Sequence, residues 1–279
     1  MHSPTQSPAT SSIELNNGVE IPTLGLGVYQ SGPGAETQQA VRFALDAGYR
    51  HIDTASAYGN EKDVGVAISS SRIARHDLFI TTKLWNSDHG YEATLRAFDK
   101  SRIELGLDYI DLYLIHWPVP GLRMESWRAM EELLDRGLCR AIGVSNYTIR
   151  HLDEHLSTSA VAPAVNQVEF SPFLYQKQLL DYCRERNIQI EAYSPLTQGK
   201  KLKHRVVKEI SRKYGRTPAQ ILIRWAIEHR LVVIPKSVHR ERIEENAQVF
   251  DFAISSQDMA RLDSLDEGFR TCWDPTHES

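Results

Sequence analysis

The chain has 279 residues and a formal net charge of −4 at pH 7, with 41% hydrophobic and 24% charged residues. This composition is typical of a globular protein, and the negative net charge gives no electrostatic reason to expect nucleic acid or an anionic membrane surface as a partner. No apolar run reaches the roughly 18 residues that a membrane-spanning helix needs.

The amino-terminal residues and the cysteines indicate the cellular compartment. Residues 1–12 are polar and lack both the basic start and the apolar core of a secretory signal, so we expect them to form a disordered tail. The three cysteines, Cys139, Cys183 and Cys272, are odd in number and lack the spacing of metal ligands. We therefore expect reduced thiols in a cytoplasmic protein.

The predicted elements begin with a β-hairpin from Ile13 to Ile21, in which apolar and acidic residues alternate on either side of the turn sequence Asn17-Gly18. Strands and helices alternate after it. A capping box at Thr217 and Gln220 marks the start of one helix, with Pro218 in its first turn. The predicted strands cover 23–28, 51–54, 78–85, 110–117, 139–146, 164–170, 188–195 and 231–237. The predicted helices cover 36–48, 61–70, 91–106, a segment ending at 137, 148–157, 176–187, 204–214, 218–229, 240–249 and 256–265.

This alternation predicts an α/β fold. Apolar, β-branched strands that alternate with helices form parallel sheets covered by helices. Eight such units in a chain close to the ~250 residues of a typical (β/α)8 barrel favour the closed TIM barrel over an open sheet. We expect residues 13–279 to form one barrel domain, with the hairpin covering its amino-terminal end and a short tail at its carboxyl terminus.

Polar residues occur near the ends of seven successive predicted strands. The carboxyl ends of barrel strands meet on one face, which is where the active sites of such barrels lie. A lysine and a histidine inside otherwise apolar strands are costly to bury unless they have partners. Each residue taken alone has a simpler explanation: Asp53 could cap a loop, Tyr58 could be a half-buried aromatic residue, and His116 could be a core histidine. The residues near the strand ends are Asp53, Lys83, His116, Ser145, Asn146, Gln167, Tyr193, Lys236 and Ser237.

Two other kinds of site are weighed against this one. Gly25-Leu26-Gly27 begins a dinucleotide-binding glycine pattern, but Gln30 stands where the third glycine belongs, so these glycines are more consistent with close packing in a strand. A metal-dependent barrel hydrolase could use Asp53 and His116. Such sites need several histidine or carboxylate ligands, whereas this chain offers lysine, asparagine and glutamine, so we expect no metal.

Seven stretches taken together resemble the aldo-keto reductase family, in the same order along the chain. The resemblance extends from about residue 13 to 270, and the short predicted loops resemble the compact microbial members. It implies a barrel that reduces carbonyl groups with a nicotinamide cofactor. The stretches are DTASAYGNE (53–61), TTKLW (81–85), LIHWP (114–118), GVSN (143–146), VNQVEF (165–170), YSPL (193–196) and IPKSVHRERIEEN (234–246).

The resemblance implies four catalytic residues, Asp53, Tyr58, Lys83 and His116. The reaction needs a general acid for the oxygen that becomes an alkoxide, and Tyr58 is the expected donor. Tyrosine has an ordinary pKa of about 10. We expect the Lys83 ammonium to lower that pKa, Asp53 to pair with Lys83, and His116 to orient the substrate oxygen by a hydrogen bond.

The resemblance also implies the cofactor and substrate sites. The cofactor is expected to be NADPH, with its 2′-phosphate near a helix start where Lys236, Ser237 and Arg242 gather. The implied substrate-pocket residues are Tyr29, Trp85, His116 and Trp117. The implied cofactor residues are Ser145, Asn146, Gln167, Tyr193, Ser194, Leu196, Lys236, Ser237, Val238, Arg242, Glu245 and Asn246.

The resemblance is least informative about the substrate, because the loops that set it are short here. We expect several small aldehydes, ketones or dicarbonyls as substrates, and a monomeric enzyme that binds neither nucleic acid nor a membrane. A cofactor-binding sensor or structural subunit of the same fold is the alternative. The presence of all four implied catalytic residues favours the enzyme.

Overall fold

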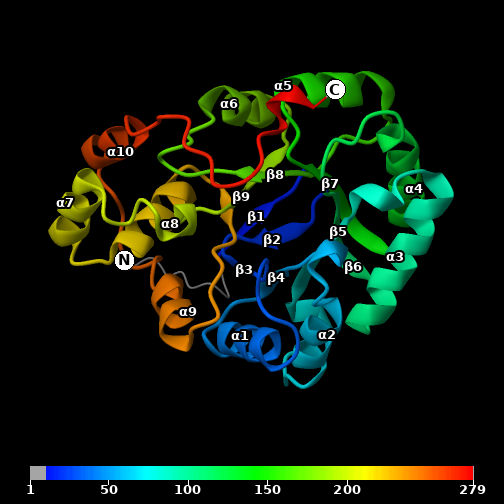
Figure 1. Cartoon of the computed structure of the whole chain (residues 1–279), viewed down its shortest axis with the longest axis horizontal. Coiled ribbons are helices and arrows are strands. Elements are labelled where there is room, and N and C mark those ends of the chain that lie inside the picture. The colour runs from blue at the N-terminus through cyan, green and yellow to red at the C-terminus, as the bar shows by residue number, and fades with distance from the viewer. Residues whose placement is uncertain (1–10, 279) are drawn as a thin grey trace.

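The computed structural model describes residues 11–278, whose strands form a barrel surrounded by helices (Figure 1). Eight parallel strands pair in chain order from β3 to β10. Parallel bridges from Leu24 to Val233 and from Gly27 to Lys236 bring the two edges of the sheet together. The predicted (β/α)8 barrel is therefore confirmed. The strands are β3 (Gly25–Gly27), β4 (His51–Asp53), β5 (Phe79–Leu84), β6 (Ile110–Ile115), β7 (Cys139–Ser145), β8 (Val165–Glu169), β9 (Gln189–Tyr193) and β10 (Val232–Val233).

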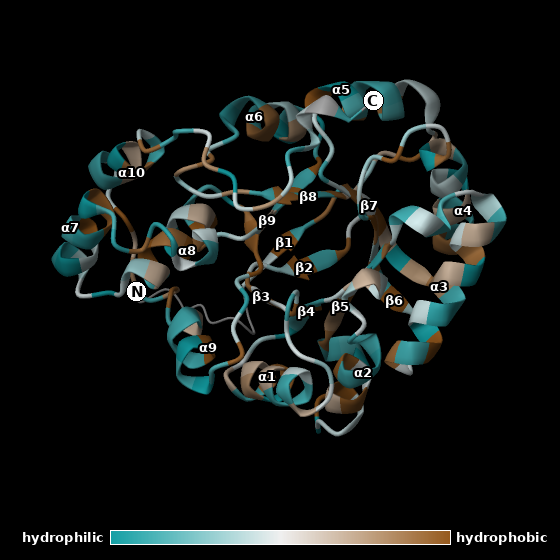
Figure 2. Cartoon of the chain, in the orientation of Figure 1, coloured by the Kyte–Doolittle hydropathy of each residue, from teal (hydrophilic) through white to brown (hydrophobic). Residues whose placement is uncertain are grey.

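The helices lie outside the sheet, and their apolar faces turn toward it. Figure 2 shows hydrophobic residues along the strands and hydrophilic residues over much of the surrounding helices. The predicted capping box is present at the start of α8, where Thr217 and Gln220 satisfy each other's backbone N–H groups. The helices are α1 (Ala35–Asp46), α2 (Glu61–Ser69), α3 (Tyr91–Leu105), α4 (Arg123–Asp135), α5 (Ile149–Thr158), α6 (Lys177–Glu185), α7 (Arg205–Tyr214), α8 (Pro218–Glu228), α9 (Arg240–Ala247) and α10 (Ser256–Asp263).

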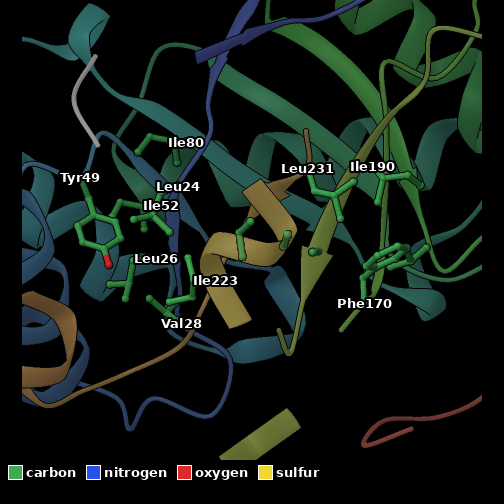
Figure 3. Close-up of a cluster of buried hydrophobic side chains, with 14 of the residues drawn as sticks. Leu24, Leu26, Val28, Tyr49, Ile52, Ile80, Phe170, Ile190, Ile223 and Leu231 are labelled. Carbon is green, nitrogen blue, oxygen red and sulfur yellow. The ribbon is translucent and has the colours of Figure 1, made fainter. Parts of the chain in front are cut away.

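Two sets of apolar side chains pack on opposite faces of the sheet. The larger set joins the strands to the helices, and Figure 3 shows part of it, including Leu26 and Ile52 from the strands and Ile223 from α8. The smaller set packs inside the barrel and includes Phe79 and Val165, the first residues of β5 and β8. Because side chains alternate between the faces of a strand, the outward side chains of a strand join the larger set and its inward side chains line the barrel interior. Since the smaller set includes the first residues of β5 and β8, the amino-terminal end of the interior is apolar.

The amino-terminal hairpin closes that end of the barrel, as predicted. β1 (Ser12–Glu14) pairs antiparallel with β2 (Glu20–Pro22). Leu15 and Ile21 pack against the interior apolar set. The side-chain amide of Asn17 donates to the carbonyl of Arg140 at 2.9 Å, which ties the turn to the start of β7. The open end of the barrel interior is therefore the opposite, carboxyl end.

Some boundaries differ from the prediction. Ser11 and Ser12 belong to the hairpin instead of the predicted disordered tail, because Ser12 pairs with Pro22 and Ser11 Oγ lies 3.0 Å from the hydroxyl of Thr23. The rest of that predicted tail, residues 1–10, lies outside the described residues. β10 covers only two residues of the strand predicted over 231–237, since Pro235 has no N–H for the ladder. Across residues 11–278, no helix is both long and apolar enough to cross a bilayer.

Candidate active site

A cavity of about 1320 Å³ opens at the carboxyl ends of the strands. It brings together every residue predicted for the cofactor and the substrate, and all the predicted catalytic residues except Lys83. Lys83 is 0% exposed and lies behind the cavity wall. The predicted residues that line the cavity are Tyr29, Asp53, Tyr58, Trp85, His116, Trp117, Ser145, Asn146, Gln167, Tyr193, Ser194, Leu196, Lys236, Ser237, Val238, Arg242, Glu245 and Asn246.

The Lys83 ammonium is held by a complete set of oxygen acceptors. Its Nζ donates to Asp53 Oδ1 at 2.6 Å, to Asp53 Oδ2 at 2.8 Å and to the carbonyl of Thr54 at 2.9 Å, and it lies 3.4 Å from Tyr58 Oη. Asp53 ends β4, and Lys83 lies near the end of the neighbouring parallel strand β5, so the fold itself juxtaposes them. A buried ion pair persists only when additional hydrogen bonds satisfy both partners. Gln167 supplies one to Asp53 Oδ2, at 2.8 Å.

Hydrogen bonds on both sides fix the short loop that carries Tyr58. After the extended residue Ala55 the chain forms the 3₁₀ turn Ser56–Tyr58. The hydroxyl of Thr54 donates to Asn60 Oδ1 at 2.8 Å, and Asn60 Nδ2 donates to the carbonyl of Val28 at 3.0 Å. The loop is thus tied to the segment that follows β3, and the phenol is held beside the ammonium of β5.

The acidity of Tyr58 differs from the prediction. Burial raises the pKa of Tyr58 well above its ordinary value of 10.0, and the charge of Asp53 raises it further. The net direction is therefore opposite to the lowering expected from Lys83. The ammonium is already neutralised by both oxygens of Asp53, whereas the desolvation of a phenolate acts in full. Tyr58 is a neutral phenol throughout the physiological pH range.

His116 forms part of an aromatic wall and is also neutral. Burial, followed by the nearby charge of Lys83, lowers the pKa of His116 well below 6.5. Its ring meets Tyr58 edge-on with centroids 5.7 Å apart, and it meets Trp85 in the same way at 5.2 Å. Trp117 stacks on the other side at 6.5 Å. A neutral imidazole can donate one hydrogen bond into the cavity.

Opposite these residues, a hydrogen-bonded wall presents oxygen atoms. Asn146 Nδ2 donates to the carbonyl of His116 and to Ser145 Oγ, both at 3.0 Å, while Asn146 Oδ1 accepts from the hydroxyl of Tyr193 at 2.8 Å. The hydroxyl of Ser145 donates to the carbonyl of Gln167 at 2.8 Å. The donors of this wall are used within the protein, so its remaining hydrogen-bonding capacity is that of an acceptor.

Cations stand at the outer end of the cavity, where the chain passes from β10 to α9. Lys236 donates to the carbonyl of Gln30 at 3.0 Å, and within residues 11–278 neither Lys236 nor Arg242 takes part in an ion pair. Both side chains are exposed. Glu245 accepts from the hydroxyl of Thr217 at 2.8 Å and is thereby turned toward α8. This end of the cavity has the chemistry of an anion site.

The carboxyl-terminal tail also lines the cavity, through Thr271, Cys272 and Trp273, none of which was predicted to do so. In Figure 1 the tail runs from α10 past α6 to a terminus beside α5. The buried carboxylate of Glu169, at the end of β8, accepts from the backbone N–H groups of Thr271 at 2.7 Å and Cys272 at 3.1 Å. The sequence signals were a glutamate in an apolar strand and a tryptophan in a polar tail, but neither signal identifies which strand end the tail meets.

Two further observations concern the other kinds of site that were weighed against this one. Within the described part of the chain, no three His, Cys, Asp or Glu side chains are grouped so that they could hold a metal ion. The glycines of β3 serve close packing: a Cβ at Gly25 would lie 2.6 Å from His51 Nδ1, and one at Gly27 would lie 3.0 Å from the carbonyl of Ile234. They form no phosphate-binding turn.

Comparison with known proteins agrees with this geometry. Residues 23–267 match the model of the aldo/keto reductase family. The chain is 49% identical to glyoxal reductase of Bacillus subtilis (strain 168) over 259 residues, covering 93% of this chain and 94% of the relative. It is 46% identical to methylglyoxal reductase DkgA of Escherichia coli (strain K12) over 269 residues, covering 94% and 96%. The crystal structure of MGS-M4, an aldo-keto reductase from a Medee basin deep-sea metagenome library, superposes with a TM-score of 0.92 at 46% identity, covering 95% of this chain and 98% of that one. The chain is an oxidoreductase of the aldo/keto reductase family.

Proposed function

We propose that the protein reduces small aldehydes, ketones and dicarbonyls to alcohols with NADPH, with Tyr58 as the general acid. The observation that carries this proposal is the contact of Lys83 with both Asp53 and Tyr58 at the wall of the cavity. It joins a phenol that can donate a proton to a charged group that stabilises the anion left behind. Such a pair has no evident use in a protein that only binds a cofactor.

The chain's own residues handle the proton and the substrate oxygen. Bound NADPH supplies the hydride that forms the new C–H bond. As charge develops on the substrate oxygen, His116 donates a hydrogen bond to it, and the proton of Tyr58 Oη moves to it. The phenolate that remains lies 3.4 Å from the Lys83 ammonium and is reprotonated from water before the next turnover. An alkoxide is a far stronger base than a phenolate, so the raised pKa of Tyr58 does not prevent this step.

The walls of the cavity suit the two ends of the cofactor. The acceptors of Ser145, Asn146 and Gln167 fit the –NH₂ group of a nicotinamide carboxamide, and the ring of Tyr193 offers a stacking surface for the nicotinamide. At the outer end Lys236, Ser237 and Arg242 suit the 2′-phosphate that distinguishes NADPH from NADH. Ser194, Leu196 and Val238 also line the cavity and would contact the middle of the cofactor, and Glu245 and Asn246 would flank the adenine.

Aromatic residues set the substrate class. Tyr29, Trp85 and Trp117 offer apolar surface beside the phenol and the imidazole, and the loops at this rim are short. Two relatives named for glyoxal and methylglyoxal point to reactive dicarbonyls as substrates. With few polar groups to reject a wrong compound, we expect several small carbonyls to react. Because one chain supplies every residue of this site, we propose a monomer, and the free cysteines Cys139, Cys183 and Cys272 support a cytoplasmic location.

The deciding experiment follows NADPH absorbance with a panel of glyoxal, methylglyoxal, simple aldehydes, ketones and sugar-derived carbonyls. We expect turnover of several compounds, with no one of them exceeding the others by more than about 10⁴ in kcat/KM. Larger selectivity would contradict the open site. NADPH binding without turnover of any carbonyl would favour the cofactor-binding sensor over the enzyme.

A further inference from the structure

A buried carboxyl group that the proposed reaction does not use lies directly behind Gln167. Glu191, in the middle of β9, is 0% exposed. Gln167 Nε2 donates to Glu191 Oε2 at 2.8 Å and to Asp53 Oδ2 at the same distance. The other carboxyl oxygen, Oε1, lies 3.5 Å from His51 Nε2 and has no hydrogen-bond partner within the described residues.

Burying a carboxyl group without satisfying both oxygens is costly, so its presence calls for a specific role. The surroundings are built to receive it. Gly25 leaves space for the ring of His51, and the hydroxyl of Thr81 holds that ring from the other side at 3.0 Å. The charged or titratable groups that face Glu191 are His51, Asp53, Lys83 and Tyr58. Burial raises the pKa of Glu191 to about 8, and the charge of Asp53 raises it as well. Burial therefore favours the neutral form of Glu191.

A side-chain amide has two N–H groups and one carbonyl oxygen. In Gln167 the nitrogen is shared between two carboxyl groups, both inside the barrel. The side-chain carbonyl oxygen of Gln167 is therefore the part of the amide that can accept a hydrogen bond from a ligand in the cavity. Asp53 alone would restrain only one of the two N–H directions, whereas Asp53 and Glu191 together fix the plane of the amide.

We propose that Glu191 is a positioning residue that fixes the amide of Gln167, so that its carbonyl oxygen accepts a hydrogen bond from the carboxamide –NH₂ of a nicotinamide cofactor. This inference rests on the proposed function. Glu191 itself would contact neither the cofactor nor the substrate. Its replacement should weaken only the hydrogen bond between Gln167 and the carboxamide –NH₂ of the cofactor.

Three variants and two cofactors test this. Glu191→Met keeps the length and volume of the side chain and removes the acceptor. Glu191→Asp keeps the acid but withdraws it from Gln167 by one methylene group. Glu191→Gln keeps an oxygen in reach of Gln167 and serves as the matched control. The cofactors are NADPH and the reduced 3-acetylpyridine analogue of NADPH, in which a methyl group replaces the carboxamide –NH₂. Binding is measured by fluorescence titration, and thermal unfolding checks the fold.

We expect wild-type protein and Glu191→Gln to bind NADPH more tightly than the analogue. Glu191→Met and Glu191→Asp should bind NADPH about fivefold more weakly, the factor expected for one hydrogen bond between neutral groups, and bind the analogue as wild type does. The test needs only one of these two variants, Glu191→Met or Glu191→Asp, to fold. Equal weakening of both cofactors, or unchanged preference for NADPH in a folded Met or Asp variant, would overturn the inference. Wild-type protein that binds NADPH but reduces no carbonyl would refute the proposed function and leave this binding test intact.

Discussion

The two ends of the cavity hold positive charges in opposite ways. At the inner end Lys83 is 0% exposed and Asp53 is 2% exposed, and their hydrogen bonds are complete before any ligand arrives. At the outer end Lys236 and Arg242 are exposed and, within residues 11–278, take no part in ion pairs. A buried charge must be compensated by the fold, whereas an exposed one is compensated by water until a ligand replaces it. Changes at the inner end should therefore affect stability and turnover, and changes at the outer end should affect affinity alone.

The largest expected effect is that of Tyr58→Phe. Removing the hydroxyl should lower kcat by about 10²- to 10⁴-fold, because the substrate oxygen loses its proton donor. NADPH affinity should stay within about twofold of wild type, since the aromatic ring remains. Steady-state kinetics and fluorescence titration check the two values. A variant that retains more than about a tenth of wild-type kcat would show that Tyr58 is not the acid.

Lys83→Met tests whether a change at the inner end lowers both activity and stability. We expect loss of turnover together with a drop of about 3–5 kcal/mol in the free energy of unfolding, because Asp53 becomes an unpaired buried charge. Lys236→Met is the matched control at the outer end, where unfolding free energy should change by no more than about 0.5 kcal/mol. Urea denaturation measures both. Similar stability losses in the two variants would remove the contrast between the ends.

Buried and exposed histidines should also differ in how they affect the pH dependence of folding stability. His155 is 1% exposed, and burial lowers its pKa to about 4. Because the unfolded chain takes up the proton at about pH 6.5, its contribution to stability is complete above pH 6.5 and is lost as pH falls toward 4. By linkage His155 should account for about 2 kcal/mol of lost stability at pH 5 relative to pH 8.

The measurement compares His155→Phe with His76→Phe, since the side chain of His76 is 82% exposed. Denaturation at pH 5 and pH 8 should show that His155→Phe reduces the pH dependence of stability by about 2 kcal/mol and that His76→Phe leaves it unchanged. If His155→Phe retains the same slope as wild type, the buried ring of His155 does not contribute to acid sensitivity.

The smallest expected effect belongs to the outer end. Arg242→Ala should weaken NADPH binding by about tenfold and barely change NADH binding, because a charge-assisted hydrogen bond to the 2′-phosphate is lost. Arg240→Ala on the same helix is the control, since Arg240 is paired with Glu244 at 2.7 Å. With Lys236 contributing as well, wild-type protein should prefer NADPH to NADH by about two orders of magnitude or more. Equal binding of the two cofactors would refute the phosphate site while leaving the inner end unaffected.

Local pattern was enough to predict the barrel, the hairpin and the polar residues at the strand ends that meet at the cavity, whereas the other predicted lining residues came from the family resemblance. The spacing of apolar residues that distinguishes a strand from a helix is visible within each short segment of the sequence. The carboxyl ends of parallel barrel strands must then meet on one face. Asp53, His116 and Gln167 could be assigned to one site on that basis, with the family resemblance supplying their expected roles. Residues Ser11 and Ser12 were misassigned because two serines carry no strand pattern of their own.

Tertiary structure decided what depends on partners distant in the chain. The pKa of Tyr58 is set by how deeply the phenol is buried and by how fully Asp53 neutralises Lys83, and neither quantity has a local signature. Glu191 becomes a partner of Gln167 only when β8 and β9 pair, and Glu169 meets the backbone of Thr271 across 102 residues of chain. Desolvation and hydrogen-bond pairing depend on three-dimensional distances, so sequence periodicity indicates which face a residue occupies, and the packed barrel determines what that residue meets there.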